Sequence, residues 1–278
     1  MDRVWIDGME LEYEVRGDGE PIVLVHGSHV ADAFAPLLAE PGLTDGYQLI
    51  MYHRRGFAGS THPNGPLSIE RQAADCRDLM QHLGVRRAHV VGHSYGGLIA
   101  LQLALDAPDM VHSLALLEPA LFIVPSTPQF MEAMGPIVQT YEEGDKAGAV
   151  DSFLRAVVGP EYRSWLDRVL PGAFDQAAAD ADTFFRIELP ALQQWSFTRA
   201  DAGRIAQPVL AVLGADSHTL WPGWAEIHEL VQDWFGAEAF VLEDAAHSLQ
   251  MMNPRGIAEG LAGYFARHPL AQSSVAQA

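Results

Sequence analysis

The chain has 278 residues, of which 49% are hydrophobic and 19% charged, a balance typical of a globular protein with a sizeable core. A net charge of −19, from 17 basic and 36 acidic residues, argues against partners that need a basic surface, such as nucleic acid or an anionic membrane. Cys76 is the only cysteine, which excludes an intramolecular disulfide. No apolar run is long enough to span a bilayer and Met1–Val4 shows no signal-peptide pattern, so we expect a cytoplasmic protein, with a homodimer left open.

The first 120 residues predict strands that alternate with helices. Residues 4–15 alternate like a hairpin around Asp7-Gly8, and the apolar run Pro21–Val25 fits a buried parallel strand. The elements predicted next are, in chain order, a helix at Ala33–Ala39, a strand at Tyr47–Tyr52, a helix from Ser68 to Leu83, a strand at Val90-Val91, a helix at Leu98–Asp106 and a strand at Val111–Leu117. This alternation indicates a mostly parallel sheet covered by helices on both faces.

The alternation stops near residue 120. Residues 121–206 are typical of successive helices, with breaks at Gly144, Gly159-Pro160 and Pro171-Gly172. The elements predicted after them are a strand at Pro208–Leu213, a helix at Trp224–Trp234, a strand at Glu238–Leu242 and a helix at Pro254–Arg267, followed by a disordered tail at 269–278. We therefore expect an α/β core formed by 1–120 and 207–278, interrupted by a helical cap at 121–206. An insertion after the carboxyl end of a strand lies over the edge where parallel sheets bind ligands.

The segment Val90-Val91-Gly92-His93-Ser94-Tyr95-Gly96-Gly97 runs from an apolar strand through Gly-x-Ser-x-Gly into a helical pattern. This context is that of a nucleophile elbow, in which a sharp turn pushes the serine hydroxyl clear of the sheet. Side chains at 92 or 96 would collide with the crowded turn. We predict that Ser94 is an activated nucleophile.

A serine hydroxyl needs a neighbouring base, and twelve histidines are available. In the elbow architecture the chain order is Ser, acid, His. His247 lies in the loop between the last strand and the closing helix, at the same sheet edge as Ser94, and is the predicted base. Backbone amides must stabilise the oxyanion, and we assign these to Tyr95, directly after the nucleophile, and to Ser28, which follows His26-Gly27.

Two carboxylates compete for the role of orienting His247. Glu118 follows an apolar strand directly, and Pro119 holds it away from helical conformation. Asp216 follows the next core strand, but its alternative interpretation is a turn or helix-cap aspartate. A carboxylate buried at the sheet edge needs a partner that a catalytic histidine supplies.

The chain resembles the α/β-hydrolase fold superfamily, in its cap-bearing branch, over residues 10–267. The resemblance is carried by His26-Gly27, Arg55-Gly56-Phe57-Ala58-Gly59-Ser60, the elbow segment and Ala246-His247. Most members carry the acid as the third residue after the glycine ending strand seven; here that place holds Ser217, and Asp216 falls one residue early. A minority, including haloalkane dehalogenases and some mycotoxin lactonases, place it after strand six, which is similar to Glu118. The resemblance therefore favours Glu118 and keeps Asp216 as the alternative acid.

The predicted substrate is a small hydrophobic ester or lactone, because the insertion is rich in aromatic residues and an apolar pocket suits such a molecule. Residues expected to contact the substrate are His29, Phe122, Trp195 and Met251. The reaction needs no cofactor or metal, and the nearest zinc-like pattern, 228–232, ends in Gln rather than His. Dehalogenases and epoxide hydrolases of this superfamily use aspartate where Ser94 stands. The alternatives are a C–C bond hydrolase of dienoic diketones on the same triad and a non-catalytic small-molecule receptor.

Overall fold

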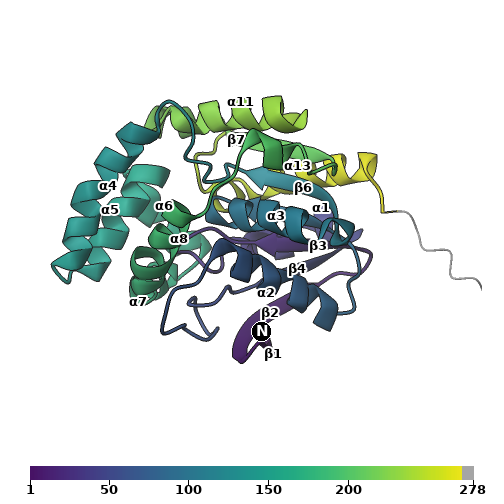
Figure 1. The fold of residues 1–278 in the computed structure, drawn as a ribbon, viewed down its shortest axis with the longest axis horizontal. Helices are drawn as coiled ribbons and strands as arrows, with labels where there is room; N and C mark the ends of the chain where they lie inside the picture. Colours follow the sequence, from purple (N-terminus) through teal and green to yellow (C-terminus); the bar gives the residue numbers. More distant parts are fainter. Residues whose placement is uncertain (271–278) are drawn as a thin grey trace, which may run out of the picture.

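The computed structural model describes residues 1–270 and contains a single sheet of eight strands (Figure 1). The strands are β1 (Asp2–Ile6), β2 (Met9–Arg16), β3 (Glu20–Val25), β4 (Tyr47–Tyr52), β5 (Ala88–His93), β6 (Val111–Leu117), β7 (Val209–Gly214) and β8 (Glu238–Leu242). Their order across the sheet is β1-β2-β4-β3-β5-β6-β7-β8. The pairings of β2 with β1 and β4 are antiparallel and all others are parallel, so the predicted mostly parallel sheet is confirmed.

Helices connect the parallel strands. Those of the core are η1 (Ala35–Ala39), α1 (Pro41–Thr44), α2 (Ile69–His82), α3 (Tyr95–Asp106), η2 (Pro108–Met110), α10 (Ser217–Leu220), α11 (Gly223–Phe235), α12 (Leu249–Met252) and α13 (Pro254–Arg267). The helix predicted at Ala33–Ala39 is a short 3-10 turn, with Pro36 in its first turn. The predictions for Tyr47–Tyr52, Val111–Leu117, Glu238–Leu242 and Pro254–Arg267 carry the same bounds as the structure.

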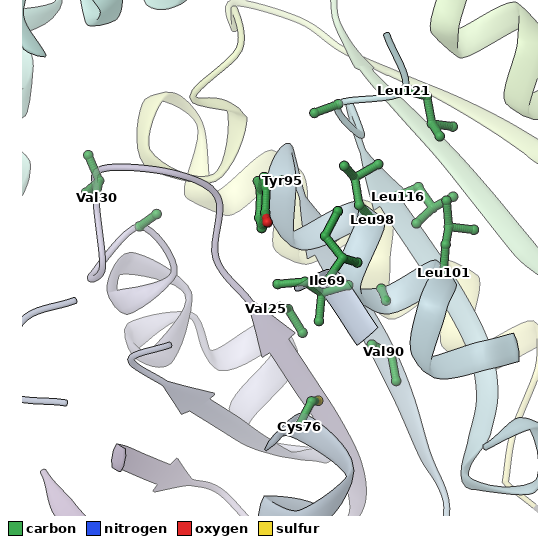
Figure 2. Packing of buried hydrophobic residues seen from close by; sticks show 14 of the residues in the cluster. Val25, Val30, Ile69, Cys76, Val90, Tyr95, Leu98, Leu101, Leu116 and Leu121 are labelled. Atoms are coloured by element: carbon green, nitrogen blue, oxygen red, sulfur yellow. The ribbon is translucent and has the colours of Figure 1, made fainter. Parts of the chain in front are cut away.

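Each face of the sheet packs against its own set of helices, as the two-residue side-chain period of a strand requires. Val23 and Val90 point to the face covered by α2 and α3, whereas Leu24 and Val91 point to the opposite face, toward η1 and α13. Figure 2 shows the first of these clusters, in which Leu98 and Leu101 of α3 lie among the strand side chains. The side chain of Cys76 is buried there, as expected for a small packed residue.

Between β6 and β7 the chain forms only helices, which we call the insertion helices. They are α4 (Thr127–Glu142), α5 (Lys146–Val158), α6 (Tyr162–Val169), α7 (Ala173–Ala179), the π-helical turn η3 (Thr183–Glu188), α8 (Leu189–Gln194) and α9 (Arg199–Ala202). Breaks fall at the three predicted places, where Gly144, Gly159 and Gly172 adopt positive φ. Helices α4 to α8 lie together at one end of the sheet, on the left of Figure 1.

Among residues 1–270, no helix combines the length and the apolar character needed to cross a bilayer. The prediction of a disordered tail at 269–278 falls mostly outside the described residues.

Candidate active site

Ser94 occupies a sharp turn between β5 and α3. Its backbone has φ of 52° and ψ of −119°, a conformation that L side chains rarely adopt and that exposes the hydroxyl above the sheet edge. The turn is crowded: a Cβ atom on Gly96 would lie 2.1 Å from the carbonyl oxygen of Val25 in β3. Glycine at 96 is therefore required for α3 to start this close to the neighbouring strand.

The structure brings Ser94, His247 and Glu118 together from three separate loops. The distance between His247 Nε2 and Ser94 Oγ is 3.0 Å, and that between His247 Nδ1 and Glu118 Oε2 is 2.7 Å. With the imidazole proton on Nδ1, the ring donates to the carboxylate and its Nε2 accepts from the serine hydroxyl. This is the arrangement by which a base can take the proton of a serine as it attacks.

Glu118 holds its place through its backbone and its second oxygen. The residue directly follows β6, has φ of 42° and is 1% exposed. Oε1 accepts a hydrogen bond of 2.8 Å from the amide of Gly214 at the end of β7. Asp216, by contrast, has an exposed side chain, and the described residues contain no hydrogen bond between it and His247. The carboxylate beside the imidazole is that of Glu118.

Two side chains that sequence analysis did not single out support the His247 loop. The indole of Trp224 in α11 stacks on the imidazole of His247, with centroids 3.9 Å apart and planes inclined by 17°. His93 Nε2 donates to the carbonyl of His247 at 2.7 Å, and His93 Nδ1 accepts from Gln250 at 3.2 Å. Burial, together with the nearby His247, lowers the pKa of His93 to about 3, so its ring stays neutral and offers one donor and one acceptor.

Ser28 and Tyr95, the predicted oxyanion donors, flank the nucleophile. Tyr95 opens α3, and the first amides of a helix have no acceptor within the helix, so they are available to an anion. Gly27, which precedes Ser28, approaches the nucleophile closely: a Cβ built on it would lie 3.0 Å from Ser94 Cβ. The peptide between Gly27 and Ser28 therefore borders the position that an acyl oxygen would take.

A buried ion pair lies behind this peptide. Arg54 Nη1 is 2.6 Å from Glu188 Oε1, and both side chains are 1% exposed. Glu188 belongs to η3, one of the insertion helices, and its Oε2 accepts a hydrogen bond of 2.5 Å from Ser28 Oγ. Neither residue could be predicted from the sequence, because Glu188 lies 134 positions from Arg54 and 160 positions from Ser28 in the chain.

The cavity above Ser94 is small and largely apolar. Its volume is about 20 Å³, which is room for about one water molecule. Its lining, besides Ser94 and His247, consists of Ser28, Val30, Ala33, His93, Phe153, Leu154, Val157, Val158, Ser248 and Met251. Of the predicted substrate contacts, only Met251 lines this cavity.

The other three predicted contacts lie elsewhere. Phe122 and Trp195 line a separate groove of about 350 Å³, because Phe122 stacks on Phe130 and the indole of Trp195 donates to Gln102. His29 is 1% exposed and packs among phenylalanines of the insertion helices, and neither ring nitrogen has a hydrogen-bond partner within residues 1–270. Burial lowers the pKa of His29 to about 3. The described residues contain no cluster of three or more His, Cys, Asp or Glu side chains able to hold a metal ion.

The chain is similar in sequence to proteins named as a dehalogenase and as a putative carbamate hydrolase. A fluoroacetate dehalogenase of Burkholderia sp. is 33% identical over 198 residues, which are 67% of this chain and 54% of that protein. A putative carbamate hydrolase RutD of Azorhizobium caulinodans is 38% identical over 107 residues, 38% of this chain and 40% of the relative. The chain thus spans about half the length of the curated relatives it matches.

Solved structures share the fold over nearly the whole chain. An N-acyl homoserine lactone degrading enzyme has a TM-score of 0.69 at 25% identity, covering 95% of this chain and all of the other. The enol-lactonase from Burkholderia xenovorans has a TM-score of 0.78 at 22% identity with the same coverage, a likeness of fold. The sequence family described as alpha/beta hydrolase fold matches residues 20–254. With its eight-stranded sheet and its strand–turn–helix at Ser94, the chain belongs to the α/β-hydrolase fold family.

Proposed function

We propose that this protein is a serine hydrolase that cleaves a hydrophobic carboxylic ester or lactone through an acyl-enzyme. The single observation that carries the proposal is the chain of contacts from Ser94 Oγ to His247 Nε2 at 3.0 Å and from His247 Nδ1 to Glu118 at 2.7 Å. Hydroxyl, imidazole and carboxylate in this order are the groups that acyl transfer to serine requires.

In the proposed reaction, Ser94 Oγ attacks the acyl carbon while His247 Nε2 accepts its proton. Glu118 stabilises the resulting imidazolium, and the amides of Ser28 and Tyr95 donate to the oxyanion. The C–O bond to the leaving group then breaks, and His247 returns the proton to the departing alkoxide. A water molecule, deprotonated by His247, attacks the acyl-enzyme and releases the acid and free Ser94.

The apolar lining of the cavity supports a hydrophobic substrate. Phe153, Val157 and Met251 offer no hydrogen-bonding group to a sugar or a phosphate. The net charge of −19 also disfavours anionic substrates. A protein of similar fold at 25% identity degrades N-acyl homoserine lactones, which supports a lactone as one candidate substrate.

We also propose that residues 121–206 act as a cap over a core formed by 1–120 and 207–278. A cavity of about 20 Å³ is too small for an ester, so the proposed cap must move before a substrate reaches Ser94. The side chains that would have to move are those of α5, which supplies Phe153, Leu154, Val157 and Val158 to the lining.

Assay of purified protein against p-nitrophenyl esters and lactones of increasing chain length tests the proposal. We expect hydrolysis of at least one member of the panel, abolished in Ser94→Ala. Product analysis then distinguishes the reaction types: an ester gives an acid and an alcohol and a lactone gives a single hydroxy acid, whereas a dienoic diketone cleaved at a C–C bond gives an acid and a second carbonyl-bearing fragment. Activity that survives in Ser94→Ala would overturn the acyl-enzyme.

A further inference from the structure

We propose that Arg54 and Glu188 are positioning residues that orient the oxyanion amide of Ser28, so that the oxyanion hole is complete only when the insertion helices are docked on the core. This inference rests on the proposed function. It concerns a buried guanidinium and a buried carboxylate that neither contact the triad nor lie in the cavity.

The orientation of the Ser28 amide follows from peptide geometry. In a trans peptide the carbonyl of residue 27 and the amide of residue 28 lie in one plane and point in opposite directions. The carbonyl oxygen of Gly27 accepts hydrogen bonds from Arg54 Nη2 at 2.8 Å and from His26 Nδ1 at 2.7 Å. With that carbonyl fixed on one side, the Ser28 N–H must point to the other.

Arg54 also contacts His26 directly and Tyr95 through Gln72. Its Nε donates to the carbonyl of His26 at 3.0 Å, and its backbone amide donates to His26 Nε2. Its Nη1 donates to Gln72 at 2.6 Å, and the Gln72 amide in turn donates to the hydroxyl of Tyr95 at 3.2 Å. A single guanidinium is therefore hydrogen-bonded to the Gly27–Ser28 peptide through the Gly27 carbonyl and is linked to the Tyr95 hydroxyl through Gln72. A lysine cannot replace this planar fork, because its donors radiate from one atom.

Glu188 connects this network to the insertion helices. One of its oxygens accepts from Arg54 Nη1 and the other accepts from Ser28 Oγ. The carboxylate therefore binds both Ser28 and the guanidinium that holds the Gly27–Ser28 peptide. Without Glu188 the buried guanidinium would have no counter-charge, since its other acceptors named above are neutral. Movement of η3 away from the core would thus release the guanidinium and the Ser28 side chain together.

The chain offers a matched control in Asp180, which lies at the end of α7. This carboxylate is 3% exposed and also joins the insertion helices to the core, by accepting from the amide of Ala58 at 2.8 Å and by contacting His62 Nε2 at 2.8 Å. Its side-chain contacts are Ala58, His62 and Gln176, and they do not include Gly27 or Ser28. Asp180→Asn therefore alters a different contact between the insertion helices and the core, while Glu188 keeps its place beside Arg54 and Ser28.

The experiment compares Arg54→Lys, Glu188→Gln and Asp180→Asn with the wild type, using the ester from the panel that is hydrolysed fastest. Loss of one oxyanion donor costs about 10²–10³ in kcat, so misorientation of Ser28 should lower kcat about 10–100-fold. We expect this loss in Arg54→Lys and Glu188→Gln, with KM within about threefold of wild type. Affinity for a trifluoromethyl ketone, which binds as an oxyanion, should fall in proportion to kcat/KM. Asp180→Asn should keep kcat within about threefold.

Ser28→Ala keeps the ion pair between Arg54 and Glu188 intact. It is the substitute variant if circular dichroism shows that Arg54→Lys or Glu188→Gln is not folded. It removes only the hydroxyl contact to Glu188, and we expect an intermediate loss of kcat. Unchanged kcat and ketone affinity in the folded variants, or an equal loss in Asp180→Asn, would overturn the inference. Those results are distinct from failure of the proposed function, which would appear as a wild type that hydrolyses no ester or lactone of the panel.

Discussion

The carboxylate of Glu118 accepts a hydrogen bond of 2.8 Å from the amide of Gly214, the glycine that ends β7. The resemblance to other members of the family places their usual acid three residues after this glycine, where Ser217 stands here. A glutamate supplied from the end of β6 therefore reaches across to the end of β7, and its other oxygen meets His247 at 2.7 Å. A glutamate side chain is longer than that of an aspartate and starts here from the neighbouring strand, so Glu118 can contact both Gly214 and His247.

This relationship predicts different effects for two carboxylate substitutions. Glu118→Gln replaces the acceptor of the Nδ1 proton by an amide and favours the wrong imidazole tautomer, so we expect kcat to fall by about 10³–10⁴. Asp216→Asn alters an exposed side chain and should leave kcat within about threefold. Steady-state kinetics of both variants with one ester provides the measurement. Equal losses, or a larger loss in Asp216→Asn, would assign the acid's role to Asp216.

Crowding at the turn predicts opposite stability changes for two glycine substitutions. Gly96→Ala would place a Cβ 2.1 Å from the carbonyl oxygen of Val25, a backbone atom that cannot move freely, and should destabilise the protein by about 3 kcal/mol or more. Gly263→Ala is its control: it lies on the exposed face of α13, where the nearest atom is 3.7 Å away. We expect a gain of about 0.5–1 kcal/mol. Urea unfolding of both variants measures the difference, and a Gly96→Ala protein of normal stability would contradict the packing.

Buried neutral histidines predict a loss of stability in mild acid. Burial lowers the pKa of His29 to about 3, against about 6.5 in an unfolded chain. Below pH 6.5 the unfolded state therefore binds more protons than the folded state, and the free energy of unfolding decreases as the pH is lowered. For this one group the loss between pH 7 and 5 is about 2 kcal/mol. His53 acts in the opposite sense: although burial lowers its pKa, Asp32 and Glu12 outweigh burial and raise it, so its contribution is complete below about pH 6.5 and is lost as the pH rises through the raised value.

The contribution of His29 to the pH dependence of stability can be isolated by substitution. His29→Asn removes the titrating group and keeps a residue that tolerates the positive φ of 68° at this position. Urea unfolding at pH 7 and pH 5 should show a pH-dependent loss about 2 kcal/mol smaller in the variant than in the wild type. The same loss in both proteins would mean that His29 titrates normally in the folded state.

The lining of the catalytic cavity predicts a change of chain-length preference. Phe153 of α5 lines the cavity and is only half-buried, so Phe153→Ala should enlarge the space beside Ser94 at moderate cost to stability. We expect the ratio of kcat/KM for long-chain over short-chain esters to rise at least about threefold, since each accommodated methylene contributes to transition-state binding. Phe130→Ala, in α4 and away from the cavity, is the control and should leave this ratio unchanged. A ratio unaltered in Phe153→Ala would place the acyl group elsewhere.

The sequence predicted those features whose signals are local. Gly-x-Ser-x-Gly after an apolar run predicted the turn at Ser94, and two-residue alternation predicted the hairpin of β1 and β2. Glu118 was a candidate because a carboxylate stood directly after an apolar strand and before a proline, and the resemblance to other family members favoured it over Asp216. Parallel strands bring their carboxyl ends to one edge, so the sequence positions of such residues predict their neighbourhood.

Features that depend on tertiary packing could not be predicted. The pairing of Arg54 with Glu188 joins an early loop to an insertion helix, and no periodic pattern connects the two. The stacking of Trp224 on His247 depends on how α11 lies against its loop. Aromatic content predicted an apolar pocket but not which rings line it, because most aromatic residues of 121–206 pack on one another, as Phe122 does on Phe130.

Active-site labelling shows whether Ser94 is a nucleophile activated by His247. A fluorophosphonate reacts with an activated serine whether or not the natural substrate is known, and mass spectrometry of the digested protein locates the adduct. We predict a single adduct on Ser94, absent in Ser94→Ala and formed at least about 10²-fold more slowly in His247→Asn. A wild-type protein that takes up no label, or one labelled on Ser94 at the same rate in His247→Asn, would contradict the account; the first result would favour a non-catalytic receptor.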